Sequence, residues 1–317
     1  VRQIVVGDGK VYVFDQGFVT EISTAETIGL DESIEFIQAN QELIMLRDEG
    51  LNPLKWDGSN AGFVRFGASA LPDSPVPLSS TGTYAGGRLW LVKDRDDIYA
   101  SDIFDTNTYE YVYQKFSAQK GDGDEITRLI PYHDDYLLIF KKTKVYAMSG
   151  VKFAANQTAF NADDLPTTAK LSDSVTIKQV LNNFGLVAPK CVVVHGEQVT
   201  FLSYKGIASI SRTTEGQLQG IDVTLSAPIQ PTIDRINWSS VEGACAGTHD
   251  NYLFFAVPLD SSTVNNAVLV YDLETQSWVS IWNGDLVSPT DFFNDAETLI
   301  TLNSDGAFRE WFVDDPW

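Results

Sequence analysis

The segment HDDYLLIF (133–140) contains the pattern that decides the fold, a short polar turn followed by four apolar residues of strand-forming type. This pattern occurs seven times along the chain. The copies are GDGK before VYVF (11–14), ANQE before LIML (43–46), AGGR before LWLV (89–92), HDDY before LLIF (137–140), HGEQ before VTFL (199–202), HDNY before LFFA (253–256) and NDAE before TLIT (298–301).

Further strand-like runs flank the apolar quartets. Runs before the turns lie at 34–38, 126–131, 190–194 and 289–293, and runs after the quartets lie at 143–148, 206–210, 267–271 and 306–311. The Gly, Asn and Asp residues between them supply the positive φ that tight hairpins need. Each unit is therefore predicted to be an antiparallel meander of three or four strands.

The quartets are mostly apolar, which is typical of strands that are covered on both faces. A meander cannot cover both of its faces alone, so we expect successive units to pack face to face. The quartets begin 32, 46, 48, 62, 54 and 45 residues apart, close to the ~40 to 50 residues of a propeller blade. The prediction is an all-β fold, a β-propeller of seven blades, or of six if the first and last units share one blade.

One domain spanning residues 1–317 is expected. Little helix is expected in it. Only the segments 31–39 and 180–183 could form one or two helical turns, and both also fit strands. The polar interval at 151–174, within an insertion at 149–176, is predicted to be a projecting loop or arm that contacts a neighbouring subunit.

The charge balance is strongly acidic, with 22 Lys and Arg against 43 Asp and Glu and a net charge of −21. Such a surface repels phosphate backbones, so tight binding to nucleic acid is not expected, although DNA could pass without being held. Solubility is the simpler interpretation of this excess. Cys191 and Cys245 belong to no CxxC pair and are interpreted as small core residues. No apolar run approaches the roughly 18 residues of a membrane helix, and the start at Val1 indicates processing or a longer parent product.

Three segments resemble the propeller-type structural proteins of bacteriophage tails, particularly the tail nozzle or hub proteins of short-tailed phages. They are GDGDEITRLIPYHDDYLLIFKKTKVYAMSG (121–150), NNFGLVAPKCVVVHGEQVTFLSYKGIASIS (182–211) and NNAVLVYDLETQSWVSIW (265–282). They cover under half of the chain, and the chain is shorter than the full nozzle pattern. It is their ordered succession that carries the resemblance.

The resemblance implies a non-enzymatic component of the virion tail. Its expected partners are copies of itself in a ring, a hexamer, together with other tail or portal-adaptor proteins. The ring would surround the channel used in genome ejection, and its acidic wall would let DNA pass without specific binding. No cofactor and no insertion into a membrane are expected.

Common catalytic signatures are absent from the sequence: GxSxG, GxxxxGK[ST], HExxH, and GxGxxG opening a helix. His133, His195 and His249 occupy equivalent turn positions in three units, so a structural role is favoured over a metal site. The turn acids Asp122, Asp124 and Glu125, and likewise Asp94, Asp96 and Asp97, do not match the calcium-loop pattern and are interpreted as solvated, with a weak divalent-ion site as the alternative. No catalytic, cofactor-binding or metal-binding residue is assigned.

The seven tryptophans divide into two groups. Trp90, Trp278 and Trp311 fall inside strand runs and are predicted to pack within or between blades. Trp56, Trp238, Trp282 and Trp317 lie near turns or ends, where packing is again favoured but an exposed ring could bind a partner protein or a sugar.

Two other functions stay open at this point. One is a carbohydrate-binding or host-recognition propeller that uses exposed Trp and Tyr side chains in loops. The other is a propeller glycosidase or lyase, which would require Asp, Glu, Arg and Tyr residues to converge in a funnel.

Overall fold

The computed structural model describes most of the chain. The described residues are 3–15, 18–30, 32–59, 61–67, 75–112, 114–133, 136–151, 175–212, 218–220, 224–283, 288–295 and 298–311. The predicted arm at 151–174 lies outside them except for Val151. No helix among the described residues is long and apolar enough to cross a membrane.

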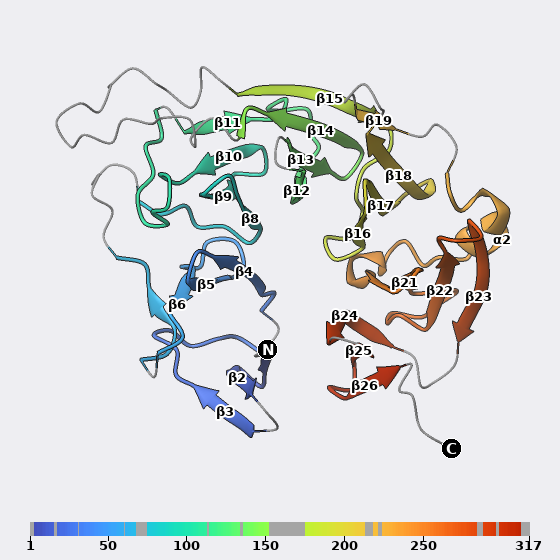
Figure 1. Cartoon of the computed structure of the whole chain (residues 1–317), viewed down its shortest axis with the longest axis horizontal. Helices are drawn as coiled ribbons and strands as arrows, with labels where there is room; N and C mark the ends of the chain where they lie inside the picture. Colours follow the sequence, from blue (N-terminus) through green and yellow to red (C-terminus); the bar gives the residue numbers. More distant parts are fainter. Residues whose placement is uncertain are drawn as a thin grey trace. The chain divides into compact units, whose positions relative to one another are not determined.

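Seven antiparallel sheets make up the described part of the chain, and each is a meander in sequence order (Figure 1). Contacts divide the chain into one compact unit of Val1–Ile139 with Tyr146–Lys178 and another of Phe140–Val145 with Gln179–Trp317. This is the predicted seven-bladed β-propeller, and each blade has its own sheet. The alternative of six blades is wrong, because the first and last strands form separate sheets.

The first four sheets contain strands β1 to β15. Their bounds are β1 Gln3–Gly7, β2 Lys10–Asp15 and β3 Phe18–Ile22; β4 Glu35–Ala39, β5 Glu42–Leu46, β6 Leu54–Trp56 and β7 Val64–Arg65; β8 Gly82–Ala85, β9 Arg88–Lys93, β10 Asp97–Ala100 and β11 Lys115–Ser117; β12 Ile126–Tyr132, β13 Tyr136–Lys141, β14 Lys144–Ser149 and β15 Thr176–Asn182.

The last three sheets contain strands β16 to β26. Their bounds are β16 Val192–His195, β17 Gln198–Ser203, β18 Gly206–Arg212 and β19 Leu218–Gly220; β20 Cys245–His249, β21 Tyr252–Val257, β22 Ala267–Asp272 and β23 Ser277–Asn283; β24 Pro289–Asp295, β25 Thr298–Asn303 and β26 Phe308–Trp311.

The seven apolar quartets all lie in the second strand of a sheet, and their side chains alternate between two cores. In β5, Ile44 and Leu46 join a cluster shared with the third sheet, whereas Met45 joins a cluster shared with the first. In β21, Phe255 packs with fifth-sheet residues and Phe254 packs toward the seventh sheet. Because both faces are covered, most positions of these strands are apolar.

Successive sheets also touch along their first strands. In the first unit β4 contacts β8 and β8 contacts β12, and in the second unit β16 contacts β20 and β20 contacts β24. Within each unit, the first strand of a sheet therefore lies next to the first strand of the following sheet, as in a propeller.

Helical conformation is scarce among the described residues: it occurs in 3₁₀ turns at Ala227–Ile229 and Val241–Gly243, in helix α2 at Gln230–Ile233 and at the single residue Val151. The first of these turns and α2 each have a proline in their first turn, a position that suits proline because its missing N–H would be unpaired there anyway. The two segments considered for helix, 31–39 and 180–183, contribute instead to strands β4 and β15.

Candidate functional site

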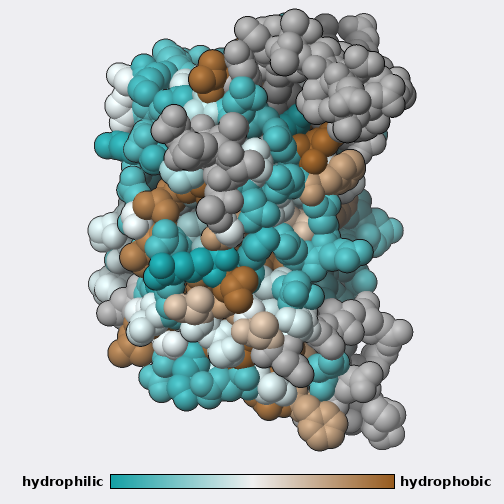
Figure 2. Space-filling model, turned by 90° about the vertical axis from the view of Figure 1, so that its left-hand side faces the viewer, coloured by the Kyte–Doolittle hydropathy of each residue, from teal (hydrophilic) through white to brown (hydrophobic). Residues whose placement is uncertain are grey.

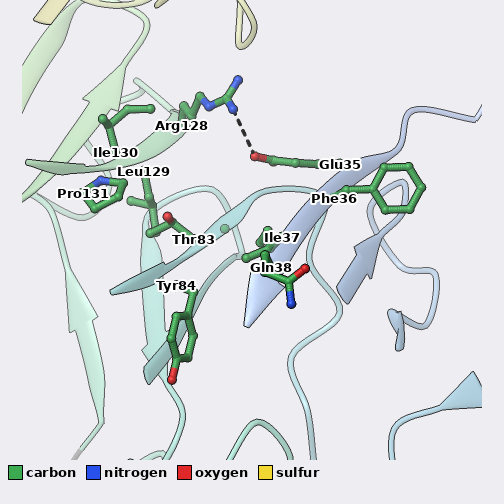
Figure 3. Close-up of a pocket in the computed structure, with 11 residues that line it drawn as sticks. Glu35, Phe36, Ile37, Gln38, Thr83, Tyr84, Arg128, Leu129, Ile130 and Pro131 are labelled. Carbon is green, nitrogen blue, oxygen red and sulfur yellow. Dashed lines mark ion pairs between the residues drawn. The ribbon is translucent and has the colours of Figure 1, made fainter. Parts of the chain in front are cut away.

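A pocket of about 250 Å³ lies within the first unit, where the first strands of three consecutive sheets meet. Its lining comes from β4, β8 and β12, and Figure 3 shows the polar side chains Glu35, Gln38, Thr83, Tyr84 and Arg128 among apolar ones. The side chain of Arg128 forms an ion pair with Glu35, with 3.6 Å between Nη2 and Oε1. This pair joins the second sheet to the fourth across the third.

The pocket offers limited acid–base chemistry. Glu35 is the single carboxylate in its described lining, whereas glycosidase chemistry uses two carboxylates on either side of a cleft. Tyr84 donates a hydrogen bond to Asn40, and burial raises the pKa of Tyr84 above its ordinary value, so this phenol is neutral near pH 7. The Arg128–Glu35 ion pair and the Tyr84–Asn40 hydrogen bond connect neighbouring blades. The cavity between them has room for a small polar ligand.

Two of the predicted partner-binding tryptophans belong to cores. Trp56 is only 6% exposed, packs against Phe63 and donates its indole N–H to the Ser59 carbonyl. Trp282 is half-buried and stacks on Trp311, with ring centroids 5.0 Å apart and an interplanar angle of 17°. Both rings are therefore engaged mainly inside the protein, and Trp317 lies outside the described residues.

Trp238 has a different environment. It follows α2, packs partly against the core between the fifth and sixth sheets, and lies 5.5 Å from the ring of Tyr204. Tyr204 is 52% exposed. Of the three predicted tryptophans that the structure describes, Trp238 is the one whose neighbouring aromatic ring is more than half exposed.

The three tryptophans predicted to pack do so. Trp90 is fully buried in the core between the third and fourth sheets. Trp278 packs against the core between the fifth and sixth sheets, and Trp311 packs against the core between the sixth and seventh.

The three histidines end the first strands of separate sheets, or directly follow one. His133 follows β12, His195 ends β16 and His249 ends β20. His195 Nε2 is 2.8 Å from Thr200 Oγ1, burial lowers the pKa of His195, and His249 is only 8% exposed. Among the described residues, no three His, Cys, Asp or Glu side chains are placed to hold a metal ion.

The acidic turn at 94–97 is not uniformly solvated: the expectation is wrong for Asp96, which is 9% exposed, and for Asp97. The Asp97 side chain is 1% exposed and accepts ion pairs from both Lys115 and Lys120, at 2.8 Å each. Burial alone would raise the pKa of Asp97, but hydrogen bonds from these two lysines and from Ser117 lower it. The carboxylate fastens β10 to β11 and to the loop that follows.

The outer edge of the first sheet is a surface that the sequence analysis did not single out. This sheet has three strands, whereas sheets two to six have four, and no described strand pairs with the outer side of β3. Phe18 and Val19 of β3 are 76% and 57% exposed. On the face drawn in Figure 2, hydrophobic residues form separate spots among hydrophilic ones. The sequence signal for this exposed edge was the adjacent apolar pair Phe18–Val19, which lies in a strand without the quartet pattern.

Comparisons with known proteins identify a fold and no family. No protein-family model matches the chain, and no curated protein matches its sequence. The β-propeller domain of Cps50 (Swd1) from Myceliophteria thermophila has a TM-score of 0.56 at 11% identity, covering 96% of this chain and 90% of that one. The computationally designed Ika8 protein has a TM-score of 0.53 at 9% identity, covering 98% and 93%. BamB from Moraxella catarrhalis has a TM-score of 0.49 at 11% identity, covering 99% and 95%. At these identities the likeness extends to the propeller fold alone.

Proposed function

We propose that this chain is a non-enzymatic structural protein of a phage tail, a nozzle, hub or adaptor component that assembles with copies of itself around the path of the genome. Its partners in this proposal are those copies and neighbouring tail or portal-adaptor proteins, and its location is the virion. The resemblance of segments 121–150, 182–211 and 265–282 to tail propellers supplies the identity of the assembly.

The outer edge of β3 is the observation that carries the assembly role. Natural β proteins normally protect edge strands with charges, prolines or bulges, because unpaired backbone groups recruit other strands. Here Phe18 and Val19 are exposed on a regular five-residue strand, with one ion pair, Lys10–Glu21, beside them. Pairing with another copy would bury these side chains and complete the backbone hydrogen bonds.

The net charge supports the second part of the proposal. With 43 acidic and 22 basic residues, a ring of copies would present a negative wall to any channel that it encloses. DNA phosphates are repelled by such a wall, so a genome could move past it without being bound. No reaction is assigned to the protein.

Light scattering of the purified full chain at rising concentration tests the role of the β3 edge. We expect a multimer for the wild-type protein and a monomer for Val19→Lys, since a lysine on an edge strand opposes pairing. The matched control is Val112→Lys, which adds the same charge at a residue that is 78% exposed and lies in no strand. This control should assemble as the wild type does.

Mass spectrometry of purified particles tests the location. Peptides of this chain in particles washed free of lysate would support the virion role. A chain that stays monomeric at every concentration and is missing from the particles would refute the proposal.

A further inference from the structure

Tyr204 and Trp238 form an aromatic pair at the surface of the second unit. Tyr204 lies in the tight turn between β17 and β18, and Trp238 lies between α2 and the 3₁₀ turn at Val241–Gly243. Their ring centroids are 5.5 Å apart and their planes are inclined by 47°. Two inclined rings, one half-exposed and one partly buried, form an open apolar platform rather than a closed core contact.

The polar groups of this pair are unused within the described part of the chain. Trp56, Trp90, Trp278 and Trp311 each donate the indole N–H to a protein acceptor. Trp238 Nε1 donates to no acceptor among the described residues, and this atom is not fully buried. The Tyr204 hydroxyl likewise has no described partner. A tryptophan that keeps both a ring face and an N–H in reach of solvent can bind an amphipathic ligand.

Lys205 adds a positive charge next to the pair. Its Nζ lies over the ring of Phe184, 4.6 Å from the centroid, and no described carboxylate pairs with it. The ammonium group keeps its hydrogen-bonding capacity, since the contact with the ring uses the charge rather than the N–H groups. Two donor groups therefore lie on the platform, Trp238 Nε1 and the Tyr204 hydroxyl, while the Lys205 ammonium lies over the Phe184 ring.

The backbone under both rings is held in place. In the Tyr204 turn, Ser203 Oγ donates to the Gly206 carbonyl at 2.9 Å and accepts the Lys205 N–H at 3.1 Å. Gly206 has a φ of +114°, and a Cβ there would meet Ser226 Oγ at 2.3 Å. This turn is therefore fixed before any ligand arrives, which lowers the entropic cost of binding.

The segment that carries Trp238 is fixed in the same way. Asn237 Nδ2 donates to the Ser262 carbonyl at 2.8 Å. Arg235 forms a two-pronged ion pair with Asp260, with Nε–Oδ1 and Nη2–Oδ2 distances of 2.9 and 2.8 Å. Both rings thus project from preorganised backbone.

We propose that Tyr204 and Trp238 form a binding site for a neutral hexose unit of a polysaccharide. The rings would cover the apolar C–H face of a pyranose, while Trp238 Nε1 and the Tyr204 hydroxyl donate to its hydroxyl and ring oxygens. A saccharide carries an oxygen acceptor on nearly every carbon, so one sugar unit can accept hydrogen bonds from both donors while it lies on the rings. A proline-rich peptide also packs on aromatic rings, but each proline offers a single carbonyl acceptor. The net charge of −21 opposes accumulation of polyanionic chains, which favours a neutral sugar. The site goes beyond the structural role and does not depend on it.

A glycan array probed with the purified full chain, followed by titration calorimetry on the best neutral oligosaccharide, tests the site. We expect Trp238→Ala and Tyr204→Ala each to weaken binding by about tenfold or more, the loss produced by one good aromatic or hydrogen-bond contact. Trp238→Phe keeps a ring but removes the N–H and should give a smaller loss. Phe293→Ala, which removes a ring that is 37% exposed elsewhere in the same unit, should bind as the wild type does.

Circular dichroism and thermal unfolding of each variant establish that the fold is kept. A wild-type chain that binds no neutral glycan on the array overturns the proposal. So does glycan binding that survives Trp238→Ala unchanged, and so does a wild-type chain that binds a proline-rich peptide array instead. Because the experiment uses the isolated chain, its result is independent of whether the protein occurs in particles.

Discussion

Trp278 and Trp282 lie on opposite faces of the sixth sheet although they are four positions apart in β23. In a regular strand, residues four apart share a face. Here the register shifts, so that Tyr271 is opposite Trp278 while the preceding Val270 is opposite Ser280, which leaves Val279 as an extra residue. Trp278 then packs on Tyr271 in the core toward the fifth sheet, and Trp282 packs in the core toward the seventh. One β-bulge lets a single outer strand serve two interblade cores.

The separation of these cores predicts additive effects of the two tryptophans. Trp278 contacts Phe255 and Tyr271, whereas Trp282 contacts Phe254 and Trp311. Each substitution by alanine should lower the free energy of unfolding by about 2 kcal/mol, below the range for fully buried aromatic residues. The double variant should equal the sum to within about 0.5 kcal/mol in urea unfolding. A coupling energy well above that would mean that the rings share one core.

A buried charge cluster in the second sheet predicts acid sensitivity. Arg47 is 2% exposed and contacts Glu32, Glu26 and the Thr27 carbonyl. Burial alone would raise the pKa of Glu32, but hydrogen bonds from Arg47 and from the Gly29 N–H lower it below the ordinary 4.5. A lowered pKa in the folded state means that the stabilisation is complete above pH 4.5 and is lost as the pH falls through the folded value.

Unfolding measured from pH 6 to pH 2.5 tests this cluster. Replacement of one buried partner, Glu32→Gln, should cost about 3 kcal/mol at pH 6, because Arg47 is left partly unpaired. The variant should also show a weaker loss of stability toward acid than the wild type. Identical pH dependence in the two proteins would show that Glu32 does not titrate as inferred.

Asp97 predicts a contrast between two acids of one turn. Asp97→Asn removes the charge that Lys115 and Lys120 share and should destabilise the protein by about 2 kcal/mol. Asp94→Asn is the matched control, since Asp94 is exposed, forms no described ion pair and has a φ of 55°, which asparagine tolerates. Its stability should stay within about 0.5 kcal/mol of the wild type. Equal effects at both positions would contradict the inferred role of Asp97.

Gly185 predicts a severe effect from a single methyl group. A Cβ there would lie 2.2 Å from the Lys141 carbonyl oxygen and 2.5 Å from the Thr143 nitrogen, both backbone atoms. We expect Gly185→Ala to lower the free energy of unfolding by about 3 kcal/mol in urea titration, since backbone must move to admit it. Gly243→Ala, where nothing lies within 4 Å of the added carbon, should change stability little. A mild effect would mean that the backbone at Gly185 lies farther from the backbone of residues 141–143 than these distances indicate.

The blade pattern could be predicted because it depends on local chemistry repeated many times. A strand covered on both faces must be apolar throughout, so LLIF (137–140) and LFFA (253–256) stand out without knowledge of their neighbours. The first and third strands of several sheets followed from the turns beside these quartets. Cys191 and Cys245 were also placed correctly, as buried free cysteines.

The site residues were harder to predict because their environment depends on contacts distant in sequence. Trp56 and Trp238 both lie near turns, yet Phe63 covers the first while the second stays beside an exposed tyrosine. Asp97 is buried because Lys115 and Lys120 come from another strand and the loop after it. The bulge at Val279 is not marked by a glycine or by any other sequence signal. The sequence therefore could not predict that Trp278 and Trp282 of β23 pack in different cores.

A reconstruction by electron cryomicroscopy of the purified assembly tests the central claim most directly. We expect several identical copies around one axis, each with seven blades, with β3 of each copy in contact with a neighbour. Single unassociated copies in every image, or an assembly whose contacts leave Phe18 and Val19 facing solvent, would contradict it.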